Sequence, residues 1–407
     1  MKKTKPILLV LGAGRGQVGL IRSAQNYGCE VIVATQTNRR FPGMDMADYV
    51  LEVDISDPAA VLSATSGLHI DGVATTCIDT PLPSLGTLVD ARRLVGLSES
   101  ASLKCLNKLA MKKALVANEV STAPFVSLHE KQDLIMAEEL GYPYVLKALD
   151  LQGSNGVFIV KDRFEAERGY SAILQKTRQD TVIAESYIDG REFGAQAFIY
   201  HGEVLFVMEH GDTLYHGVST VPIGHYVPWE GSEFLASRAA SVVEQAINAL
   251  GLDDCAVNVD LMESAGNVYV LELTGRAGAN ALPEIVSIAT GIDYYSMIVA
   301  MALGQDPRQI WGNRNNKYLA VAAGMIIPPN TPGRIVSLAV DTDAISSKEG
   351  HINDIVYFSH PGDMIDGFKS SADCVGQVIT SAERLEDAQQ LLTDVLGSVQ
   401  ISIKELP

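Results

Sequence analysis

Apolar and polar positions in the first hundred residues follow a strand–helix–strand order. An apolar run at residues 6–11 leads into a glycine-rich turn and a helical pattern, and a second apolar run covers residues 31–34. Further strand-like runs begin at Tyr49 and Gly72. Continuous apolar strands that alternate with helices are typical of a parallel sheet covered on both faces. The pattern predicts a doubly wound α/β domain over residues 1–103.

The pattern then changes to a helix followed by paired strands. We expect a helix over residues 103–118, with most of its lysines on a solvated basic face. A β-prone run carries Lys147, and a small Gly/Ser loop separates it from a strand at residues 157–160. Backbone N–H groups of such a loop, together with a lysine inside the strand, suit phosphate oxygens. The alternative is a lysine that extends to solvent from a sheet edge.

A hairpin turning at His201-Gly202 and a long polar segment come next. The segment, residues 209–228, holds three of the eight histidines and is expected to be a loop. Loops of this length inside compact domains are often functional. We therefore expect it to line a substrate pocket, with His210 or His216 near the nucleophile; a surface excursion with its own turns is the alternative.

A second hairpin combines two carboxylates with an arginine. Side chains alternate faces along a strand, so Asp260 shares a face with Asn258, and Glu272 shares one with Thr274 and Arg276. If the two faces coincide across the turn, hard oxygen ligands converge beside a guanidinium. That combination suits a magnesium-bound phosphate. The alternative is a polar, solvated face.

Residues 311–407 have a different character. Pro- and Gly-marked turns, short strands and one helix over residues 382–396 predict a β-rich C-terminal module. No internal repeat or low-complexity segment interrupts the chain. A length of 407 residues suits two or three domains.

Composition and charge exclude several classes of protein. The chain is 47% hydrophobic and carries a net charge of -18, which argues against nucleic-acid and acidic-membrane partners. Five scattered cysteines without CxxC spacing indicate reduced thiols in a cytoplasmic protein, and no signal peptide or membrane-spanning stretch is expected.

The glycine-rich turn from Gly12 to Gly19 offers a different function, as an NAD(P) site of an oxidoreductase. That site would place an acidic residue at the end of the second strand, on the ribose. The strand ends instead in Ala34, Thr35 and Gln36. A tight turn between strand and helix is therefore the favoured interpretation.

Taken in order, these motifs resemble the ATP-grasp superfamily, specifically its carboxylate–amine ligases and among them the L-amino-acid and dipeptide ligases. The segment from Asn107 to Leu115 is similar to the family's entry helix, and Glu272-x-Thr274-x-Arg276 to its Glu-x-Asn-x-Arg signature. The resemblance implies an α/β fold of ATP-grasp architecture in three parts. These are the N-terminal α/β domain (1–103), a two-lobed nucleotide clamp (104–310, lid lobe about 115–185, metal lobe about 186–310) and a C-terminal β-rich cap (311–407).

The resemblance also implies roles for single residues. Arg276 would hold the transferring phosphoryl group, beside Asp260 and Glu272 as catalytic magnesium ligands, with Thr274 as a further ligand. The implied ATP-binding residues are Lys108, Lys147, Gly153, Ser154, Gly156, Glu185, Tyr187, Ile188 and Glu192. A helix N-terminus after Gly278 and Asn280 could hold a substrate carboxylate through backbone N–H groups.

Two positions depart from the family pattern. Asp260 stands where Glu is usual, and Thr274 stands where Asn is usual, which weakens the second metal position. The implied reaction uses ATP and Mg²⁺, or Mn²⁺ in its place, to activate a carboxylate as an acyl phosphate that an amine then attacks. Substrates would be small molecules, and the resemblance admits a homodimer.

Other functions remain open at this stage. Within the same fold these are a purine-biosynthesis or carbamoyl-phosphate type of enzyme; a biotin carboxylase would need a longer chain and a carrier segment. From other classes they are the oxidoreductase and a non-catalytic nucleotide-binding module.

Overall fold

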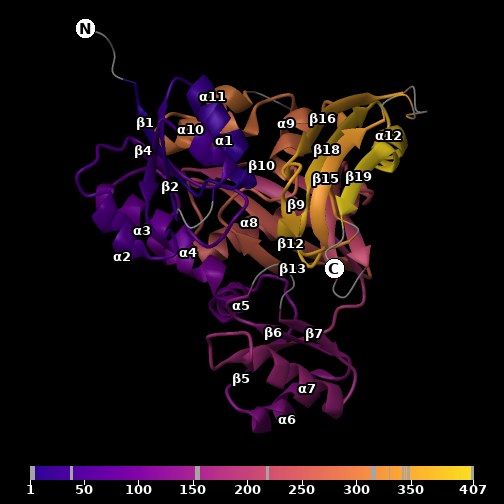
Figure 1. Cartoon of the computed structure of the whole chain (residues 1–407). Helices are drawn as coiled ribbons and strands as arrows, with labels where there is room; N and C mark the ends of the chain where they lie inside the picture. The colour runs from indigo at the N-terminus through magenta and orange to yellow at the C-terminus, as the bar shows by residue number, and fades with distance from the viewer. Residues whose placement is uncertain are drawn as a thin grey trace.

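The computed structural model describes residues 5–36, 40–151, 156–216, 220–312, 318–329, 331–341, 343, 345 and 349–404. Figure 1 shows three masses around a central sheet: the indigo N-terminal part, a lid below it, and the yellow C-terminal part on the opposite side.

The N-terminal part is the predicted parallel α/β domain. Its sheet has the order β3 (Tyr49–Glu52), β2 (Glu30–Thr35), β1 (Ile7–Leu11), β4 (Gly72–Ala74), and every pair is parallel. Helices α1 (Arg15–Asn26), α2 (Pro58–Ala64) and α3 (Leu82–Arg92) accompany it. Leu8 and Val10 pack with α1, whereas Leu9 and Leu11 pack with α2 and α3. Both faces of the sheet are therefore covered.

The helix expected over residues 103–118 is broken in two. Helix α4 (Glu99–Leu106) ends before Asn107, whose extended backbone starts α5 (Lys108–Ala117). The Asn107 side chain accepts a hydrogen bond from Ala110 N–H at 3.0 Å. An asparagine favours such a cap because its oxygen satisfies an N–H group that the helix leaves open. The break places Lys108 at the first helical position.

The lid is an antiparallel sheet with its own core. Its order is β5 (Phe125–Leu128), β8 (Val182–Ser186), β6 (Tyr144–Ala148), β7 (Val157–Val160), backed by α6 (Leu134–Ala137) and α7 (Arg163–Leu174). The buried residues of its core cluster all lie between Leu128 and Ala184. The lid therefore has a core of its own, and Figure 1 shows it as a separate mass below the central sheet.

An eight-stranded antiparallel sheet forms the centre of the molecule. Its order is β13 (Asn267–Thr274), β12 (Cys255–Ser264), β9 (Arg191–Tyr200), β10 (Glu203–His216), β11 (Thr220–Val227), β14 (Val321–Ile327), β18 (Gly376–Ala382), β16 (His351–Tyr357). Helices α8 (Glu233–Leu250), α9 (Leu282–Thr290), α10 (Tyr294–Ala302) and α11 (Arg308–Trp311) accompany it. Because β11 pairs with β14, one sheet runs across the expected domain boundary at residues 310–311.

A smaller sheet completes the C-terminal part. It has the order β17 (Met364–Ile365), β15 (Gly333–Val340), β19 (Val399–Lys404). Helix α12 (Leu385–Ser398) packs on β14 and β18, and residues such as Leu391 and Val395 share one core with Ile335 and Val378.

The polar segment at residues 209–228 is not the loop that its composition predicts. It continues β10 to His216 and contains all of β11, with Asp212 opposite His225 in the register. Polar side chains on alternate positions resemble a loop in sequence, but here they line one face of an interior hairpin. Among the described residues no single helix is long and apolar enough to cross a membrane; α9 and α10 together pass on length and composition, but they are bent by 103°.

Candidate active site

The hairpin of β12 and β13 brings the two predicted carboxylates together. Asp260 pairs directly with Glu272, and Asn258 pairs with Thr274. Asn258 also donates to Asp260 Oδ1 at 3.2 Å. Burial, with the nearby charge of Glu272 adding to it, raises the pKa of Asp260 to about 8. Two acidic groups this close, one of them strongly desolvated, are the kind of arrangement that a divalent cation relieves.

The oxygen atoms of this site fit a magnesium ion. Thr274 is buried, and its Oγ1 has no hydrogen-bond partner in the described part of the chain. Together with Asp260 and Glu272 it offers hard oxygen donors, which Mg²⁺ prefers. The residues present therefore suit the implied metal, and a buried hydroxyl without a partner is the position where a ligand or bridging water would be satisfied.

Lys108 links the entry helix to this hairpin. Its Nζ lies 3.2 Å from Glu272 Oε1 and donates to the Leu151 carbonyl at 2.9 Å. Leu151 immediately precedes the lid loop. The predicted loop residues Gly153 and Ser154 fall in 152–155, outside the described residues. Gly156, with φ of 74°, closes the loop through a bond from Ala148 N–H to its carbonyl at 3.1 Å.

Glu185 is the centre of a buried ion-pair network. Its Oε2 accepts from Lys147 at 2.9 Å and lies 3.2 Å from the Nζ of Lys112. Lys112 also donates to Thr122 Oγ1 at 2.6 Å and is only 1% exposed. The expectation of a solvated basic face is therefore wrong for Lys112, because α5 turns this side chain under the lid.

The charges in this network shift one another's pKa values. Burial lowers the pKa of Lys112 to about 8, although Glu185 opposes this. Burial alone would lower the pKa of Lys147 and raise the pKa of Glu185. The opposite charges outweigh burial, so Glu185 raises the pKa of Lys147 and the two lysines lower the pKa of Glu185. One carboxylate thus holds two cations at the inner wall of the lid. An anionic ligand such as a phosphate would find Lys147 already in place, whereas the buried Lys112 holds Glu185.

Residues predicted to contact the nucleoside lie where the lid joins the central sheet. Tyr187 and Ile188 connect β8 to β9, and Tyr187 is exposed. Glu192 stands at the start of β9, where partial desolvation and the charge of Asp212 raise its pKa. All three residues lie within six positions of one another at the connection of the lid to β9. The expected adenine and ribose roles stay predictions.

Arg276 is held by a residue that the sequence motifs did not reveal. Its Nε and Nη2 donate to the two oxygens of Asp79 at 2.6 and 2.9 Å. Asp79 comes from the N-terminal domain, and Cys77 of the same segment donates its N–H to the Ala277 carbonyl at 3.1 Å. Because Cys77 has a φ of 66° and no surrounding glycine signals a turn, this junction had no sequence signature.

The segment after Arg276 only partly matches its predicted role. Gly278 donates its N–H to Gln196 Oε1 at 2.8 Å, so this N–H is already used. Asn280 donates to the Pro222 carbonyl at 3.2 Å, and α9 begins two residues later. The role of this segment in holding a substrate carboxylate stays a prediction, and Gly278 would have to exchange Gln196 for that carboxylate.

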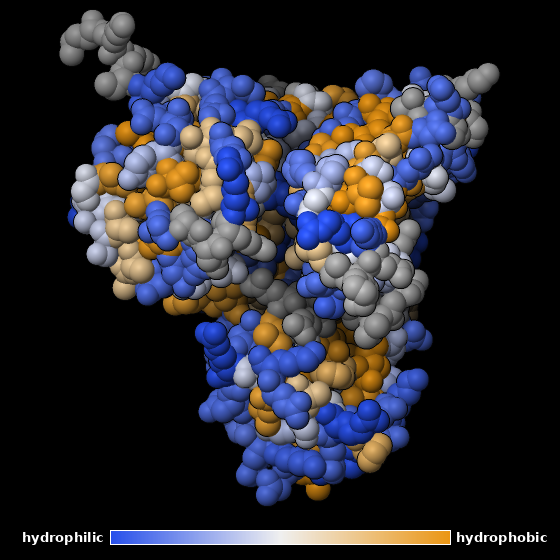
Figure 2. Space-filling view, viewed as in Figure 1, coloured by the Kyte–Doolittle hydropathy of each residue, from blue (hydrophilic) through white to orange (hydrophobic). Residues whose placement is uncertain are grey.

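A cavity of about 550 Å³ opens beside this segment. It lies between the glycine-rich turn, the start of α9 and the C-terminal part, where Figure 2 shows a cleft between the two upper masses. Glu284 and Tyr295 face it as a hydrogen-bonded pair at 2.8 Å, and burial raises the pKa of Glu284. Arg15 crosses the cleft to the Ser371 carbonyl and the Phe358 ring.

The glycines of the turn are explained by packing. A Cβ on Gly16 would lie 2.5 Å from Cys77 Cβ, and one on Gly19 would lie 2.4 Å from the Tyr295 ring. Their absence of side chains lets α1 approach the segment that carries Asp79 and the helix α10. The spacing therefore does not require a dinucleotide.

Among the predicted histidines, His210 lies in a buried cluster with Asp212 and His225. The side chain of His216 lies outside the described part of the structure. His210 is thus inside the site, on the same face as Asp260, as a strand residue and not as part of a covering loop.

Two family models match the chain. One, described as the ATP-grasp domain, matches residues 140–283, and the other, described as the L-amino acid ligase C-terminal domain 2, matches residues 325–404. The lid with the metal hairpin and the C-terminal part are therefore matched separately.

Solved structures and curated relatives extend these matches. A phosphoribosylglycinamide synthetase from Anaerococcus prevotii is 37% identical, covering 98% of this chain and all of the other, with a TM-score of 0.85. An L-amino acid ligase from Bacillus licheniformis shares the fold, with 22% identity and a TM-score of 0.83. The match covers 99% of this chain and 100% of the other. An L-arginine-specific L-amino acid ligase from Bacillus subtilis is 21% identical over 77% of this chain and 75% of its own.

Proposed function

Because the chain belongs to the ATP-grasp superfamily and is a carbon–nitrogen ligase, we propose that it joins the carboxylate of an amino acid to an amine through an acyl phosphate, releasing ADP and phosphate. The observation that carries this proposal is the pairing of Asp260 with Glu272 on the central hairpin, with Arg276 two residues beyond β13 and near enough to Asp260 for their charges to interact. These groups are suited to offset the negative charge that accumulates when a carboxylate attacks a phosphoryl group.

The residues of the lid and entry helix bind the nucleotide in this proposal. Lys147 presents a cation from the inner wall of the lid, and Lys108 presents a second beside Glu272. Lys112 of the entry helix is buried and holds Glu185 in place. Asp260, Glu272 and Thr274 would hold Mg²⁺, which would supply further charge neutralisation at the phosphates. Tyr187, Ile188 and Glu192 would hold the adenosine. The lid then excludes water, to which an acyl phosphate is sensitive.

Arg276 binds the reacting carboxylate. Its guanidinium already donates two parallel hydrogen bonds to a carboxylate, that of Asp79. A substrate carboxylate offers the same geometry. Asp79 therefore occupies Arg276 until the acid substrate and the nucleotide phosphates compete for it.

The 550 Å³ cavity receives the organic substrates. Its walls combine the buried carboxylate of Glu284, the guanidinium of Arg15 and apolar side chains such as Phe358 and Ile326. An amino acid has an ammonium group, a carboxylate and a side chain of variable polarity, and this mixture of walls can match all three. The relatives that act on amino acids point the same way.

A second candidate is a ligase that joins glycine to a phosphoribosyl amine. The 37% identity to a chain titled phosphoribosylglycinamide synthetase favours it. The cavity also adjoins the N-terminus of α1, a place where a phosphate is favoured by the helix dipole. The matched L-amino acid ligase C-terminal model favours the first candidate, because part of the cavity wall comes from that region.

Phosphate release separates these candidates. Purified protein with ATP and Mg²⁺ is given single amino acids, pairs of amino acids, or glycine with phosphoribosylamine, and products are identified by mass spectrometry. We expect phosphate release and a new amide with a pair of amino acids. Amide formed only with phosphoribosylamine would favour the second candidate, and ATP hydrolysis that no amine or acid stimulates would contradict both.

A further inference from the structure

A row of residues crosses the central sheet from the metal hairpin to His210. Asp260 on β12 pairs with Gly194 on β9, and Gly194 pairs in turn with His210 on β10. All three therefore share one line across neighbouring strands, with Gly194 between Asp260 and His210 in that row. Across β-strands such a line spans about 10 Å, within reach of side chains that lean toward each other.

Gly194 makes room for the His210 ring. A Cβ at Gly194 would lie 2.2 Å from Cε1 and 2.5 Å from Nε2 of His210. The imidazole therefore leans over β9, the strand between β10 and the strand that carries Asp260. Its Cε1 and Nε2 are the ring atoms that lie nearest to Gly194. Nε2 is buried and has no hydrogen-bond partner among the described residues.

Asp212 fixes the other nitrogen of the ring. Its Oδ1 lies 3.0 Å from Nδ1 of His210 and 2.6 Å from Nδ1 of His225. Burial alone would raise the pKa of Asp212, but the two imidazoles outweigh it and lower that pKa, so the carboxylate is ionised. An ionised carboxylate only accepts, so both imidazoles donate from Nδ1, and in its neutral form His210 carries its lone pair on Nε2.

The same three side chains could instead hold a metal ion, since their ligand atoms all lie within 4.8 Å of one another. A metal bound at Nδ1 would make Nε2 of His210 an N–H donor, and histidine ligands almost always give that proton to an acceptor. No acceptor lies beside His210 Nε2 in the described part of the chain. A lone pair at that position is the less costly arrangement, and it faces the reacting centre.

We propose that His210 accepts a proton at Nε2 from the attacking nitrogen of the amine substrate, with Asp212 and His225 as positioning residues. The proposal rests on the proposed function, since it concerns the second half of the same reaction. The nitrogen lone pair forms the C–N bond to the acyl carbon, and the C–O bond breaks with its electrons leaving on phosphate. The ammonium nitrogen loses two protons in all: His210 takes one and passes it to solvent, and the departing phosphate carries the other.

The environment of His210 suits this role. Burial lowers its pKa despite the partly compensating charge of Asp212. The imidazole is thus neutral at pH 7 and able to accept a proton, as a general base must be. The proton it gains would be stabilised by Asp212, as an ionised carboxylate stabilises an imidazolium in other hydrolytic and acyl-transfer sites.

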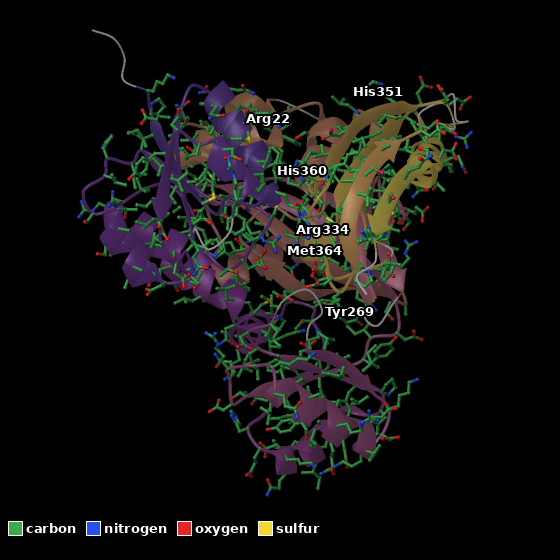
Figure 3. The ribbon with its side chains drawn as sticks, in the orientation of Figure 1. Arg22, Tyr269, Arg334, His351, His360 and Met364 are labelled. Carbon is green, nitrogen blue, oxygen red and sulfur yellow. The ribbon has the colours of Figure 1, made fainter. Side chains whose placement is uncertain are left out.

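Two nucleophiles test the proposal. An amino-acid amine is charged at neutral pH and must lose a proton before it attacks, whereas hydroxylamine is largely neutral and needs no base for that step. His210→Gln is expected to slow amide formation by roughly 100-fold or more, and hydroxamate formation at least tenfold less strongly. Gly194→Ala, which pushes the imidazole aside without removing it, should show the same selectivity. The exposed His351, at the start of β16 on the edge of the central sheet and labelled in Figure 3, provides the control as His351→Gln.

Each outcome decides a different point. Equal losses with both nucleophiles, in a variant whose melting temperature matches that of the parent, would mean that His210 only supports the structure. Unchanged rates with both would also overturn the inference. One equivalent of a transition metal in the purified protein, lost in both His210→Gln and His225→Gln, would assign the cluster to a metal instead. A parent enzyme that forms no hydroxamate with any acid would overturn the proposed function, and this inference with it.

Discussion

Arg276 and Asp79 form a two-pronged ion pair between the metal hairpin and the N-terminal domain, with Nε–Oδ1 at 2.6 Å and Nη2–Oδ2 at 2.9 Å. Both side chains are only 11% exposed. The pair connects the reacting centre to a domain that contributes no other carboxylate to it in our proposal. It also gives Arg276 a partner of the same shape as the substrate group that it is proposed to bind.

Removing the charge of Asp79 should destabilise the protein. In Asp79→Asn the buried guanidinium of Arg276 loses its counter-ion, and breaking a buried pair from one side costs about 3–5 kcal/mol. We expect a lower free energy of unfolding by denaturant titration. Asp366→Asn, an exposed position, is the control. Equal stability of the two variants would show that Arg276 finds another partner.

Glu272 is the carboxylate whose loss should affect turnover most cleanly. Its side chain is 32% exposed and pairs with Lys108, so Glu272→Gln should leave the fold near parental stability. Loss of a charge that helps hold the metal and phosphates should lower kcat by roughly 100- to 1,000-fold. Steady-state phosphate release checks this, with the exposed Glu244→Gln as control. Substantial residual activity would contradict its assignment as a metal ligand.

Lys112 should make stability depend on pH in the alkaline range. Its pKa is about 8 in the folded chain against 10.5 for an ordinary lysine, so between these values the unfolded chain binds more protons. Stability contributed at this site therefore rises as pH increases from about 8 to 10.5, by up to about 3 kcal/mol. The free energy of unfolding is compared with that of Lys112→Met, which lacks this rise. Lys113→Met, an exposed neighbour, should keep the parental slope.

A methyl group in the glycine-rich turn should be poorly tolerated. In Gly19→Ala the new Cβ would meet the Tyr295 ring at 2.4 Å, which forces α1 away from α10. Overpacking of this kind costs about 1–3 kcal/mol. Gly397→Ala, where a Cβ meets nothing within 4 Å inside helix α12, should instead be neutral or stabilising. Similar melting temperatures for the two variants would remove the packing explanation of the turn.

Short-range patterns predicted the parts of the fold that depend on local periodicity. The parallel N-terminal strands and the hairpin of Asp260 with Glu272 lie where the apolar runs and the alternation of side chains predict them. Family resemblance was needed to connect these parts, because each motif alone had an ordinary structural explanation.

Contacts between distant segments were not predictable in this way. Asp79 reaches Arg276 across 197 positions, and no local pattern encodes that approach. Lys112 looked like its exposed neighbours in sequence because the lid that buries it belongs to another segment. The β10–β11 hairpin was predicted as a loop because it is rich in polar residues, which usually lie in contact with water. Here polar side chains such as His210 and His225 are buried.

The strand pairs that join β11 to β14 also determine where this enzyme could be recombined with its relatives. Exchanging residues 311–407 alone would cut between Gly224 and its partner Met325 and leave β11 with a bare edge, which favours aggregation. The lid is different, because strands β5 to β8 pair only with one another in the described structure. A chimaera made by transplanting residues 125–186 keeps every strand pair of the transplanted sheet, so nucleotide-binding lids should be exchangeable where C-terminal caps are not.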